Sequence, residues 1–436
     1  MAAVLDRKTH YLGGPFEKDN PTLSSTLPPT NQSNLGIAII GLGGAVGTTA
    51  AAGIELIRRG LQPTTGLPLA EFADLDLVPY TNLKIHGWDL FDHDLLTAAR
   101  VHRVLDREEL DVLANDLSGR RPWTAVSNRN YCRGVVGDQD STGTHRELIS
   151  GIQQQLDAFA TDIDGRVVVI NLASTEHAIE VADEIYQRTE AFERALDENH
   201  TGISPAMLYA YACITHGVPY GNFTPSRAAE IPALRSLAAR RGVPVAGKDG
   251  KTGQTFLKTV IAPALRARAL HVDGWFSTNI LGNRDGEALR HPESLQNKLG
   301  TKGDVLTNCL GYPVEDHLVK INYYRPRGDD KEAWDNIDVS GFLGHRMQIK
   351  IDFLCKDSIL AAPLAIEIAR CLDLAARRGQ GGVLESLGVF FKAPMTTDGR
   401  EPIHSFGEQQ TELLRWLRES SEMPTAVAGK FIPRPD

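Results

Sequence analysis

The chain is poor in cysteine: its 436 residues include five, at Cys132, Cys213, Cys309, Cys355 and Cys371, and no two of them have CxxC spacing. An odd number of scattered cysteines does not describe a disulfide framework. Nor does any group of His, Cys and carboxylate residues have the spacing of a metal site. We therefore expect reduced thiols and predict no metal centre.

The chain also lacks an excess of basic charge, since 46 Lys and Arg residues stand against 55 Asp and Glu residues, for a formal net charge of -9. This balance argues against a nucleic-acid-binding surface and against a polybasic membrane patch, although a local basic pocket for a phosphate is compatible with it. The first thirty-four residues show no basic stretch followed by an apolar core, so no signal peptide is predicted. We expect a cytoplasmic protein with a small-molecule partner.

One uncharged stretch, residues 35–54, is long enough on paper for a membrane span. Its glycines argue against that interpretation, because a break at Gly41 separates a short β-like run from a helical one. The sequence instead predicts a strand at 37–40, a turn with the sequence GLGGAVG, and a helix from about residue 46 to residue 59.

A strand, a glycine-rich turn and a helix together are typical of dinucleotide binding, because glycines let a pyrophosphate approach the backbone and the helix N-terminus supplies unpaired N–H groups. Here the glycines fall at GxGxxxG, as Gly41, Gly43 and Gly47, and no acidic residue ends a second strand about twenty positions later. The next strand-like run, 83–86, leads to Asp89, which can accept from ribose hydroxyls or cap the following helix. These residues leave both a cofactor site and a plain glycine-rich turn open.

A strand of the buried type at 166–171 is followed by Ser174 and Thr175. The two residues lie either at the carboxyl edge of a parallel sheet, where ligands bind, or at the N-cap of a helix that begins at Glu176. Helical periodicity then runs from 176 to 195. Because strands alternate with helices, the sequence predicts an α/β fold.

The segment 216–226 is rich in proline and glycine, and we expect a loop there. Asn222 and Thr224 are its candidate ligand contacts.

Three polar, glycine-rich clusters lie close together, at 247–258 (GKDGKTGQTFLK), 277–286 (STNILGNRDG) and 297–302 (NKLGTK). Glycine beside amide, acid and lysine side chains lets a backbone approach a polar ligand, so this concentration predicts a site. In the third cluster, Lys298 and Lys302 share one face of a helix and repel each other unless an anion lies opposite. In the first, the ammonium of Lys258 is expected to point to solvent.

The pattern changes beyond the first cluster. Polarity alternates in the runs 318–323 and 347–353, which favours half-exposed antiparallel strands and a second sheet. Helical patterns return at 360–377 and at about 408–422.

Between Gly36 and Pro394 the ordered motifs resemble the myo-inositol-1-phosphate synthase family, NAD-dependent cyclases that convert glucose 6-phosphate to inositol phosphate. The shared motifs are the glycine turn at 41–47, GWD at 87–89, GKDGKTGQT at 247–255, TNILGNRDG at 278–286, the lysine pair 298 and 302, GDDK at 328–331, CKDSILAAP at 355–363 and the lysine of KAP at 392.

This resemblance implies an α/β protein with a Rossmann-type NAD-binding domain and an inserted α+β domain for catalysis and oligomerisation. The NAD-binding domain would span 1–255 and be completed by 361–436, and the inserted domain would span 256–360. The family is homotetrameric, so the resemblance implies the same assembly, with a sugar phosphate as ligand and no nucleic-acid or membrane partner.

The resemblance also implies individual roles. Lysine can exchange protons once its pKa is lowered by neighbouring cations and burial. Lys298 and Lys392 would act on the C5 oxygen, Lys302 would bind phosphate, and Lys331 with Lys392 would stabilise the C1 oxygen during ring closure. The implied cofactor contacts are Gly41, Gly43, Gly44, Ala45, Val46, Gly47, Asp89, Ser174, Thr175, Asp249, Asp329 and Asp357. The implied substrate contacts are Gly253, Gln254, Thr255, Asn279, Gly282, Asn283 and Asp285, with Asp357 also shaping that pocket.

The chain departs from the family pattern at several positions, namely Leu42, Ala45 and Val46 in the first turn, and Lys248, Phe256, Arg284 and Lys356 in later motifs. These departures leave open a cyclase or dehydrogenase that acts on a different sugar phosphate. A protein that binds NAD without chemistry is the third hypothesis.

Overall fold

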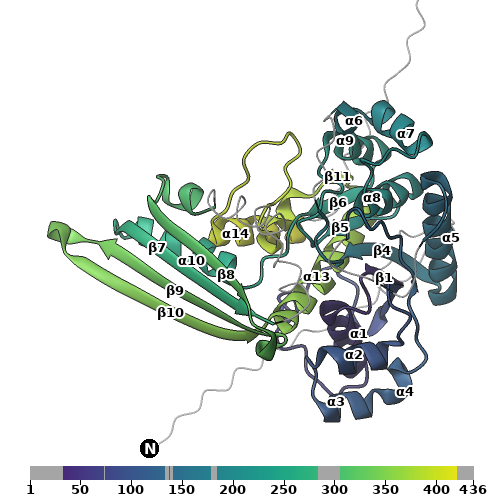
Figure 1. Ribbon diagram of the computed structural model, residues 1–436, viewed down its shortest axis with the longest axis horizontal. Helices are drawn as coiled ribbons and strands as arrows, with labels where there is room; N and C mark the ends of the chain where they lie inside the picture. Colours follow the sequence, from purple (N-terminus) through teal and green to yellow (C-terminus); the bar gives the residue numbers. More distant parts are fainter. Residues whose placement is uncertain are drawn as a thin grey trace, which may run out of the picture.

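A computed structural model describes residues 33–72, 74–132, 137, 141–177, 184–282 and 305–419. Two β-sheets organise these residues (Figure 1), a larger one wrapped in helices and a smaller one whose long strands extend away from it. Among the described residues, no helix is both long enough and apolar enough to cross a membrane. All five cysteines are free thiols, as expected.

The larger sheet has the strand order β11-β6-β5-β4-β1-β2-β3, and its paired strands run parallel. Its strands are β1 (Asn34–Ile40), β2 (Leu83–Asp89), β3 (Trp123–Thr124), β4 (Gly165–Asn171), β5 (Tyr220–Asn222), β6 (Pro244–Gly247) and β11 (Gly382–Val383). Strand order reverses between β1 and β4, and ligands bind outside the carboxyl ends of strands at such a point. The predicted α/β fold is confirmed.

Helices cover both faces of this sheet, and β1 is therefore buried on both sides. Ile37 and Ile39 pack in one core with α1 (Ala45–Arg58), α13 (Asp357–Arg377) and α14 (Phe406–Arg418). Ala38 and Ile40 pack in the other with α5 (His145–Ile163), α8 (Pro205–His216) and α9 (Pro232–Arg241). Other helices of the described residues are α2 (Leu95–His102), α3 (Arg107–Val112), α4 (Ala114–Leu117), α6 (Glu184–Gln187) and α7 (Thr189–Asp197), and 3-10 helices span Tyr80–Asn82, Arg325–Arg327, Phe342–Gly344 and Glu385–Phe390.

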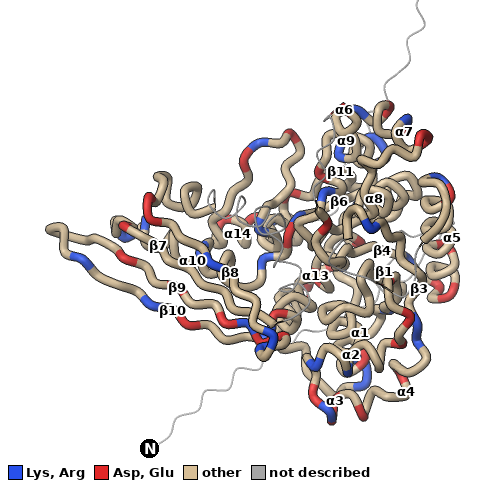
Figure 2. The backbone as a smooth tube through the Cα atoms, viewed as in Figure 1, with Lys and Arg blue, Asp and Glu red and all other residues tan. Residues whose placement is uncertain are grey.

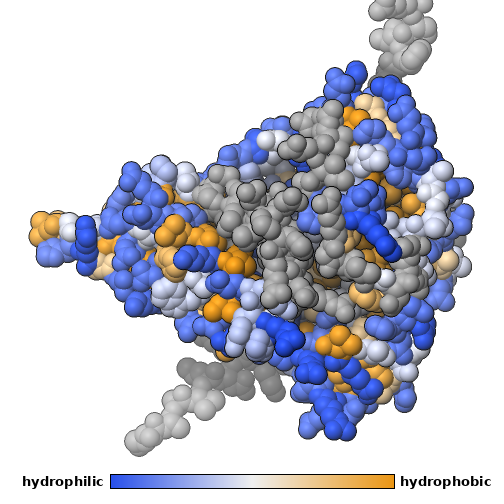
Figure 3. Space-filling view, viewed as in Figure 1, coloured by the Kyte–Doolittle hydropathy of each residue, from blue (hydrophilic) through white to orange (hydrophobic). Residues whose placement is uncertain are grey.

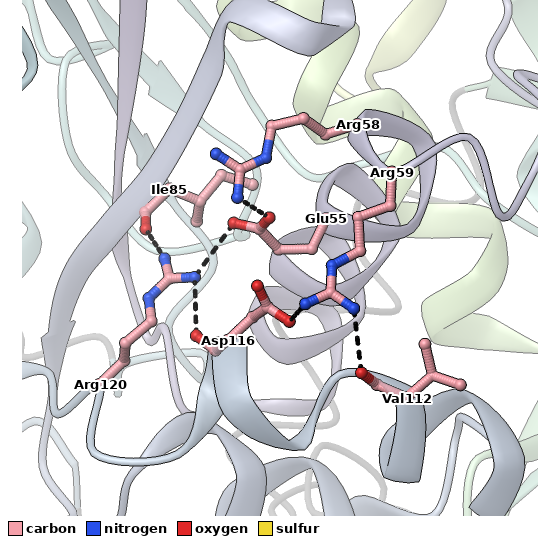
Figure 4. A network of polar contacts seen from close by, with 7 residues as sticks. All are labelled: Glu55, Arg58, Arg59, Ile85, Val112, Asp116 and Arg120. Carbon is pink, nitrogen blue, oxygen red and sulfur yellow. Dashed lines mark hydrogen bonds and ion pairs between the residues drawn. The ribbon is translucent and has the colours of Figure 1, made fainter.

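A polar network ties the end of α1 to its neighbours (Figure 4). Glu55 pairs with Arg58 and with Arg120, whose guanidinium Nη1 lies 3.3 Å from the Glu55 Oε1. Arg120 also donates to the carbonyl oxygen of Ile85 in β2 at 2.5 Å. Arg59 pairs with Asp116 of α4, so α1, β2 and α4 are held in one arrangement.

The second sheet has the order β10-β9-β7-β8, formed by β7 (His271–Leu281), β8 (Asp316–Tyr323), β9 (Asp330–Ser340) and β10 (Arg346–Lys356). On one face, α10 (Gln254–Ala267) packs Ala262 and Leu265 against Trp275 and Ile337. Figure 2 shows acidic and basic residues interspersed along the strands. The chain returns from this sheet to the larger one directly, since α13 begins at Asp357, one residue after β10 ends.

The prediction of antiparallel strands is right for β10, which pairs antiparallel with β9, and wrong for 318–323, because β8 pairs parallel with β7. Alternating polarity records only that one side of a strand is exposed, and it carries no information on direction. The chain between β7 and β8 is long enough for the crossover that a parallel pair needs.

Two other predictions need correction. The segment 216–226 is not all loop, since the buried β5 lies within it. The predicted helix at 176–195 does not begin at Glu176, and the described helices of this stretch are α6 and α7, which are separated at Arg188. Ser174 and Thr175 therefore do not cap a helix that starts at Glu176.

Candidate active site

A cavity of about 300 Å³ lies where the two sheets meet. Its lining comes from the carboxyl ends of the parallel strands, from the start of α10, from β7 and β9, and from the first turn of α13. The predicted strand-edge site and two of the predicted lysines, Lys331 and Lys392, therefore line one space.

The glycine turn after β1 forms one end of this cavity. Gly41 has φ of +88°, and its N–H donates to the Trp88 carbonyl oxygen at 2.8 Å. A Cβ at Gly47 would lie 2.5 Å from the Leu42 carbonyl oxygen, so this position excludes a side chain. Among the described residues no side chain caps α1 at Gly44, and the N-terminus of α1 faces the cavity. A pyrophosphate is the group that such a helix start accepts.

Asp89 ends β2 beside this turn. Its carboxylate accepts from the Gly43 N–H at 2.8 Å and from the Phe91 N–H at 3.0 Å. Burial raises the pKa of Asp89, and these backbone hydrogen bonds oppose that rise. The capping alternative is wrong, because the N-cap of α2 is Asp94, which accepts from the Thr97 N–H. Asp89 is thus held with its carboxylate at the cavity wall.

Two lysine–carboxylate pairs form the polar end of the cavity. The Lys392 Nζ lies 2.7 Å from Asp249 Oδ1, and the Lys331 Nζ lies 3.1 Å from Asp357 Oδ1. Thr252 also donates to Asp357, at 3.0 Å. Burial alone would raise the pKa of Asp357, but Lys331 and then Lys392 outweigh it and lower that pKa. Both ammonium groups therefore act on one carboxylate.

Main-chain hydrogen bonds hold the first of these pairs together. The Lys392 N–H donates to the Asp249 carbonyl oxygen at 2.6 Å, and the Lys251 N–H donates to the Phe390 carbonyl oxygen at 2.8 Å. The Lys248 N–H donates to the Ala393 carbonyl oxygen at 2.9 Å. This backbone pairing fixes residues 248–251 against 390–393.

The structure places most of the predicted site residues on the cavity wall. The lining includes Gly41, Gly43, Gly44, Ala45, Val46, Gly47, Asp89, Ser174, Thr175, Asp249, Gly253, Gln254, Thr255, Asn279, Lys331, Asp357 and Lys392. Lys298, Lys302, Asn283 and Asp285 lie outside the described residues.

Asp329 and Gly282 are not part of the lining. Asp329 accepts from the N–H and the hydroxyl of Ser358, at 3.1 and 2.8 Å, and so holds the start of α13. Gly282 lies against the backbone, since a Cβ there would come within 2.4 Å of the Tyr324 carbonyl oxygen.

The departures from the family pattern at 248, 256 and 356 are not part of the cavity lining. Lys248 pairs with Glu230 at 2.9 Å, and Lys356 donates to the Val104 carbonyl oxygen at 2.6 Å. Phe256 packs edge-on against Phe406, with ring centroids 5.2 Å apart. Arg284 lies outside the described residues.

Among the lining residues that sequence reasoning missed are His102 and Glu176. The His102 Nε2 lies 2.8 Å from the Gly43 carbonyl oxygen, and nothing in the helix sequence marks that contact. Glu176 directly follows the predicted site residues Ser174 and Thr175. Its position next to them is the one sequence signal that could have predicted it. Its Oε1 accepts from the Ala206 N–H at 2.8 Å, at the start of α8.

The Glu176 carboxyl is expected to make stability depend on pH. Burial raises its pKa from 4.5 to about 7, outweighing the hydrogen bonds from Ser204 and Ala206. Between these values the folded protein binds more protons than the unfolded chain, so stability falls as pH rises from 4.5 to 7. Glu176→Gln mimics the protonated carboxyl, and it should raise the melting temperature relative to the parent more at pH 8 than at pH 5. Equal differences at the two pH values would contradict this.

Comparison with known proteins places the chain in a family. A family model described as myo-inositol-1-phosphate synthase, an NAD-binding family, matches residues 67–418. An inositol-3-phosphate synthase 1 from Bacteroides thetaiotaomicron is 38% identical over 408 residues, covering 88% of this chain and 95% of that protein. The inositol-3-phosphate synthase of Saccharomyces cerevisiae is 28% identical over 471 residues, covering 92% and 87% of the two chains.

The fold has a counterpart among solved structures. The crystal structure of an inositol-3-phosphate synthase from Caenorhabditis elegans superimposes with a TM-score of 0.82 at 23% identity, covering 93% of this chain and 90% of that one. One cavity brings together the glycine turn, Asp89 at the end of β2, and the lysines Lys331 and Lys392. The family model and the relative from Bacteroides thetaiotaomicron each match most of the sequence. The chain therefore belongs to the myo-inositol-1-phosphate synthase family.

Proposed function

We propose that this protein uses NAD to cyclise D-glucose 6-phosphate to 1L-myo-inositol 1-phosphate. The observation that carries the proposal is the single cavity that joins a dinucleotide turn to two lysine–carboxylate pairs. Family membership supports the same reaction.

The residues at the turn fit the dinucleotide. Gly41 and Gly47 keep the backbone open, and the start of α1 offers N–H groups to a pyrophosphate. A carboxylate has room for about four hydrogen bonds, so Asp89, which accepts two from the backbone, retains acceptor sites for ribose hydroxyls. NAD held by these residues would supply a hydride acceptor for C5 of the sugar and, once reduced, the donor that restores it, so the overall reaction would leave the cofactor unchanged.

The lysines supply proton transfer and charge stabilisation. Lys392 exchanges a proton with the C5 oxygen, and Lys331 with Lys392 stabilises the C1 oxygen as the C1–C6 bond forms. Asp249 and Asp357 hold these two ammonium groups at the cavity wall. On the family resemblance, Lys298 acts with Lys392 and Lys302 binds the phosphate.

Asp89→Ala is expected to weaken NAD binding by about 10- to 100-fold, because a hydrogen bond to a charged group contributes roughly 1.5–3 kcal/mol. Calorimetric titration with NAD measures this loss. Asp94→Ala is a matched control, since Asp94 caps α2 away from the cavity lining. Unchanged affinity in Asp89→Ala would show that the carboxylate does not contact the cofactor.

The reaction itself is tested by phosphorus and proton NMR of glucose 6-phosphate with the protein and a catalytic amount of NAD. The cyclase produces an inositol phosphate with no net change in absorbance from NADH. A simple dehydrogenase produces NADH in proportion to the substrate oxidised. A protein that only binds NAD leaves the sugar phosphate unchanged, and either of these results would overturn the proposal.

We also infer the domain organisation and the assembly. Residues 1–255 with 361–436 form the NAD-binding domain, and 256–360 form an inserted domain that helps pair subunits into a homotetramer. In support, Leu318, Phe342, Leu343 and Leu354 of the second sheet and its β9–β10 connection are more than half exposed. Figure 3 shows hydrophobic surface at the free end of that hairpin. Large exposed apolar areas mark association sites. Light scattering after gel filtration measures the mass of the assembly and so tests the homotetramer.

We also infer a cytoplasmic location, which the free thiols and the NAD-dependent reaction support.

A further inference from the structure

A buried carboxylate lies directly behind the cavity wall. Asp335 of β9 is 0% exposed, and its Oδ1 accepts from the Trp275 indole N–H at 2.8 Å and from the Ser277 hydroxyl at 2.6 Å. Its Oδ2 accepts from Gln254 Nε2 at 3.3 Å. Asp335 does not line the cavity, whereas Gln254 does.

The neighbours of Gln254 determine which end of its side-chain amide faces Asp335. Besides Asp335, its nitrogen lies 3.1 Å from the Thr278 carbonyl oxygen and 3.3 Å from the Trp334 carbonyl oxygen. All three neighbours are acceptors, so the NH₂ group must face them and the orientation is not open to an amide flip. The Gln254 oxygen then accepts from the side-chain NH₂ of Asn279.

Asn279 is therefore oriented through Gln254 by three acceptors, of which Asp335 is the charged one and the only side chain; the other two are the carbonyl oxygens of Thr278 and Trp334. The Asn279 NH₂ is directed to Gln254, and the other end of its amide is an oxygen, which only accepts hydrogen bonds. Asn279 is on the cavity wall and 4% exposed. An acceptor held in this way recognises a hydroxyl group and disfavours an analogue that lacks it, because a buried polar group is then left unpaired.

We propose that Asp335 is a positioning residue, which fixes the hydrogen-bond polarity of the Gln254–Asn279 pair so that Asn279 Oδ1 accepts from a hydroxyl of the sugar phosphate. This inference rests on the proposed function. It adds a determinant of sugar recognition that makes no contact with substrate.

The test uses glucose 6-phosphate and its 2-, 3- and 4-deoxy analogues with the full chain and NADH, which cannot accept a hydride from the sugar, and measures binding by calorimetry without turnover. In the parent, we expect one deoxy position to bind at least about 10-fold more weakly than glucose 6-phosphate. In Asp335→Asn, an amide replaces the carboxylate opposite Gln254, and its NH₂ group can face the NH₂ group of Gln254. We expect this variant to bind glucose 6-phosphate more weakly. Its deoxy penalty should fall to less than about 2-fold.

Ser277→Ala is the matched control, because it removes a donor to the same carboxylate but leaves the Oδ2 contact to Gln254. It should destabilise the protein and retain the deoxy penalty. Thermal unfolding and NAD affinity confirm that each variant is folded. A folded Asp335→Asn with the full penalty overturns the inference.

Asn279→Leu is the second variant, and it tests the same acceptor if Asp335→Asn does not fold. The deoxy penalty must vanish in Asn279→Leu, and its persistence would show that Asn279 is not the acceptor. A parent protein with no deoxy penalty at any of the three positions also overturns the inference. A parent that does not bind glucose 6-phosphate overturns the proposed function, and the inference with it.

Discussion

Lys392→Met is expected to lower kcat for inositol phosphate formation by about a thousandfold, within the range that one positioned proton donor contributes. Methionine keeps the length and apolar volume of lysine but carries no exchangeable proton. The Lys392 ammonium lies on the cavity wall, 2.7 Å from Asp249, and its charge reaches Asp357 as well. In the proposed mechanism its loss removes the donor to the sugar oxygen, and it leaves the Asp249 carboxylate without this cation.

The measurement is single-turnover and steady-state product formation, with NAD affinity and thermal unfolding measured in parallel. Lys248→Met is the matched control, because Lys248 is the residue before Asp249 but pairs with Glu230 and does not line the cavity. We expect its kcat to stay within about 3-fold of the parent, below what the loss of a positioned proton donor costs. A Lys392→Met protein that is folded and retains a tenth or more of the activity, roughly 1.4 kcal/mol in the barrier, would remove Lys392 from the mechanism.

Glu367→Ala is expected to lower the free energy of unfolding by about 3–5 kcal/mol, because it breaks a buried ion pair and leaves a cation uncompensated. Glu367 is 0% exposed on α13, and its Oε2 lies 2.6 Å from Arg370 Nη1. Its Oε1 accepts from the Tyr80 hydroxyl at 2.5 Å and from the Leu69 N–H at 3.2 Å. The substitution therefore also removes the hydrogen bonds that join Leu69 and Tyr80 to Glu367 of α13.

Denaturation by urea, followed by circular dichroism, gives the change in unfolding free energy. Glu412→Ala serves as control, because the Glu412–Arg415 pair is about half exposed in α14. An exposed pair contributes roughly 0–1 kcal/mol. A Glu367→Ala effect as small as that of the control would contradict the buried-pair interpretation.

The start of the Rossmann-type sheet could be predicted closely from sequence. The predicted strand 37–40 and helix 46–59 lie within β1 and over α1, since an apolar run, a glycine turn and an amphipathic helix are local patterns. Asp89 was found for the same reason, because a strand and its last residue are adjacent in the chain. Short-range sequence patterns were therefore sufficient to predict the residues at one end of the cavity.

The prediction for Lys258 is wrong because burial depends on what packs around a helix. Lys258 is 3% exposed, with its Nζ 2.7 Å from His317 Nε2 and above the Trp275 ring. Burial lowers its pKa to about 8. The second sheet covers the side of α10 that the sequence alone left facing solvent.

The Asp335, Gln254 and Asn279 chain also escaped prediction, because its members come from β9, α10 and β7. No spacing in the sequence relates them. Their order emerges only when β7 and β9 pair and α10 packs across them.

The backbone pairing of 248–251 with 390–393 sets a constraint on biosynthesis. Asp249 is synthesised long before its lysine, which lies 143 positions later in the chain. During synthesis, residues 248–251 stay without these backbone partners until residues 390–393 have been made. A product that ends before residue 390 would retain the dinucleotide turn but would lack the backbone partners of residues 248–251.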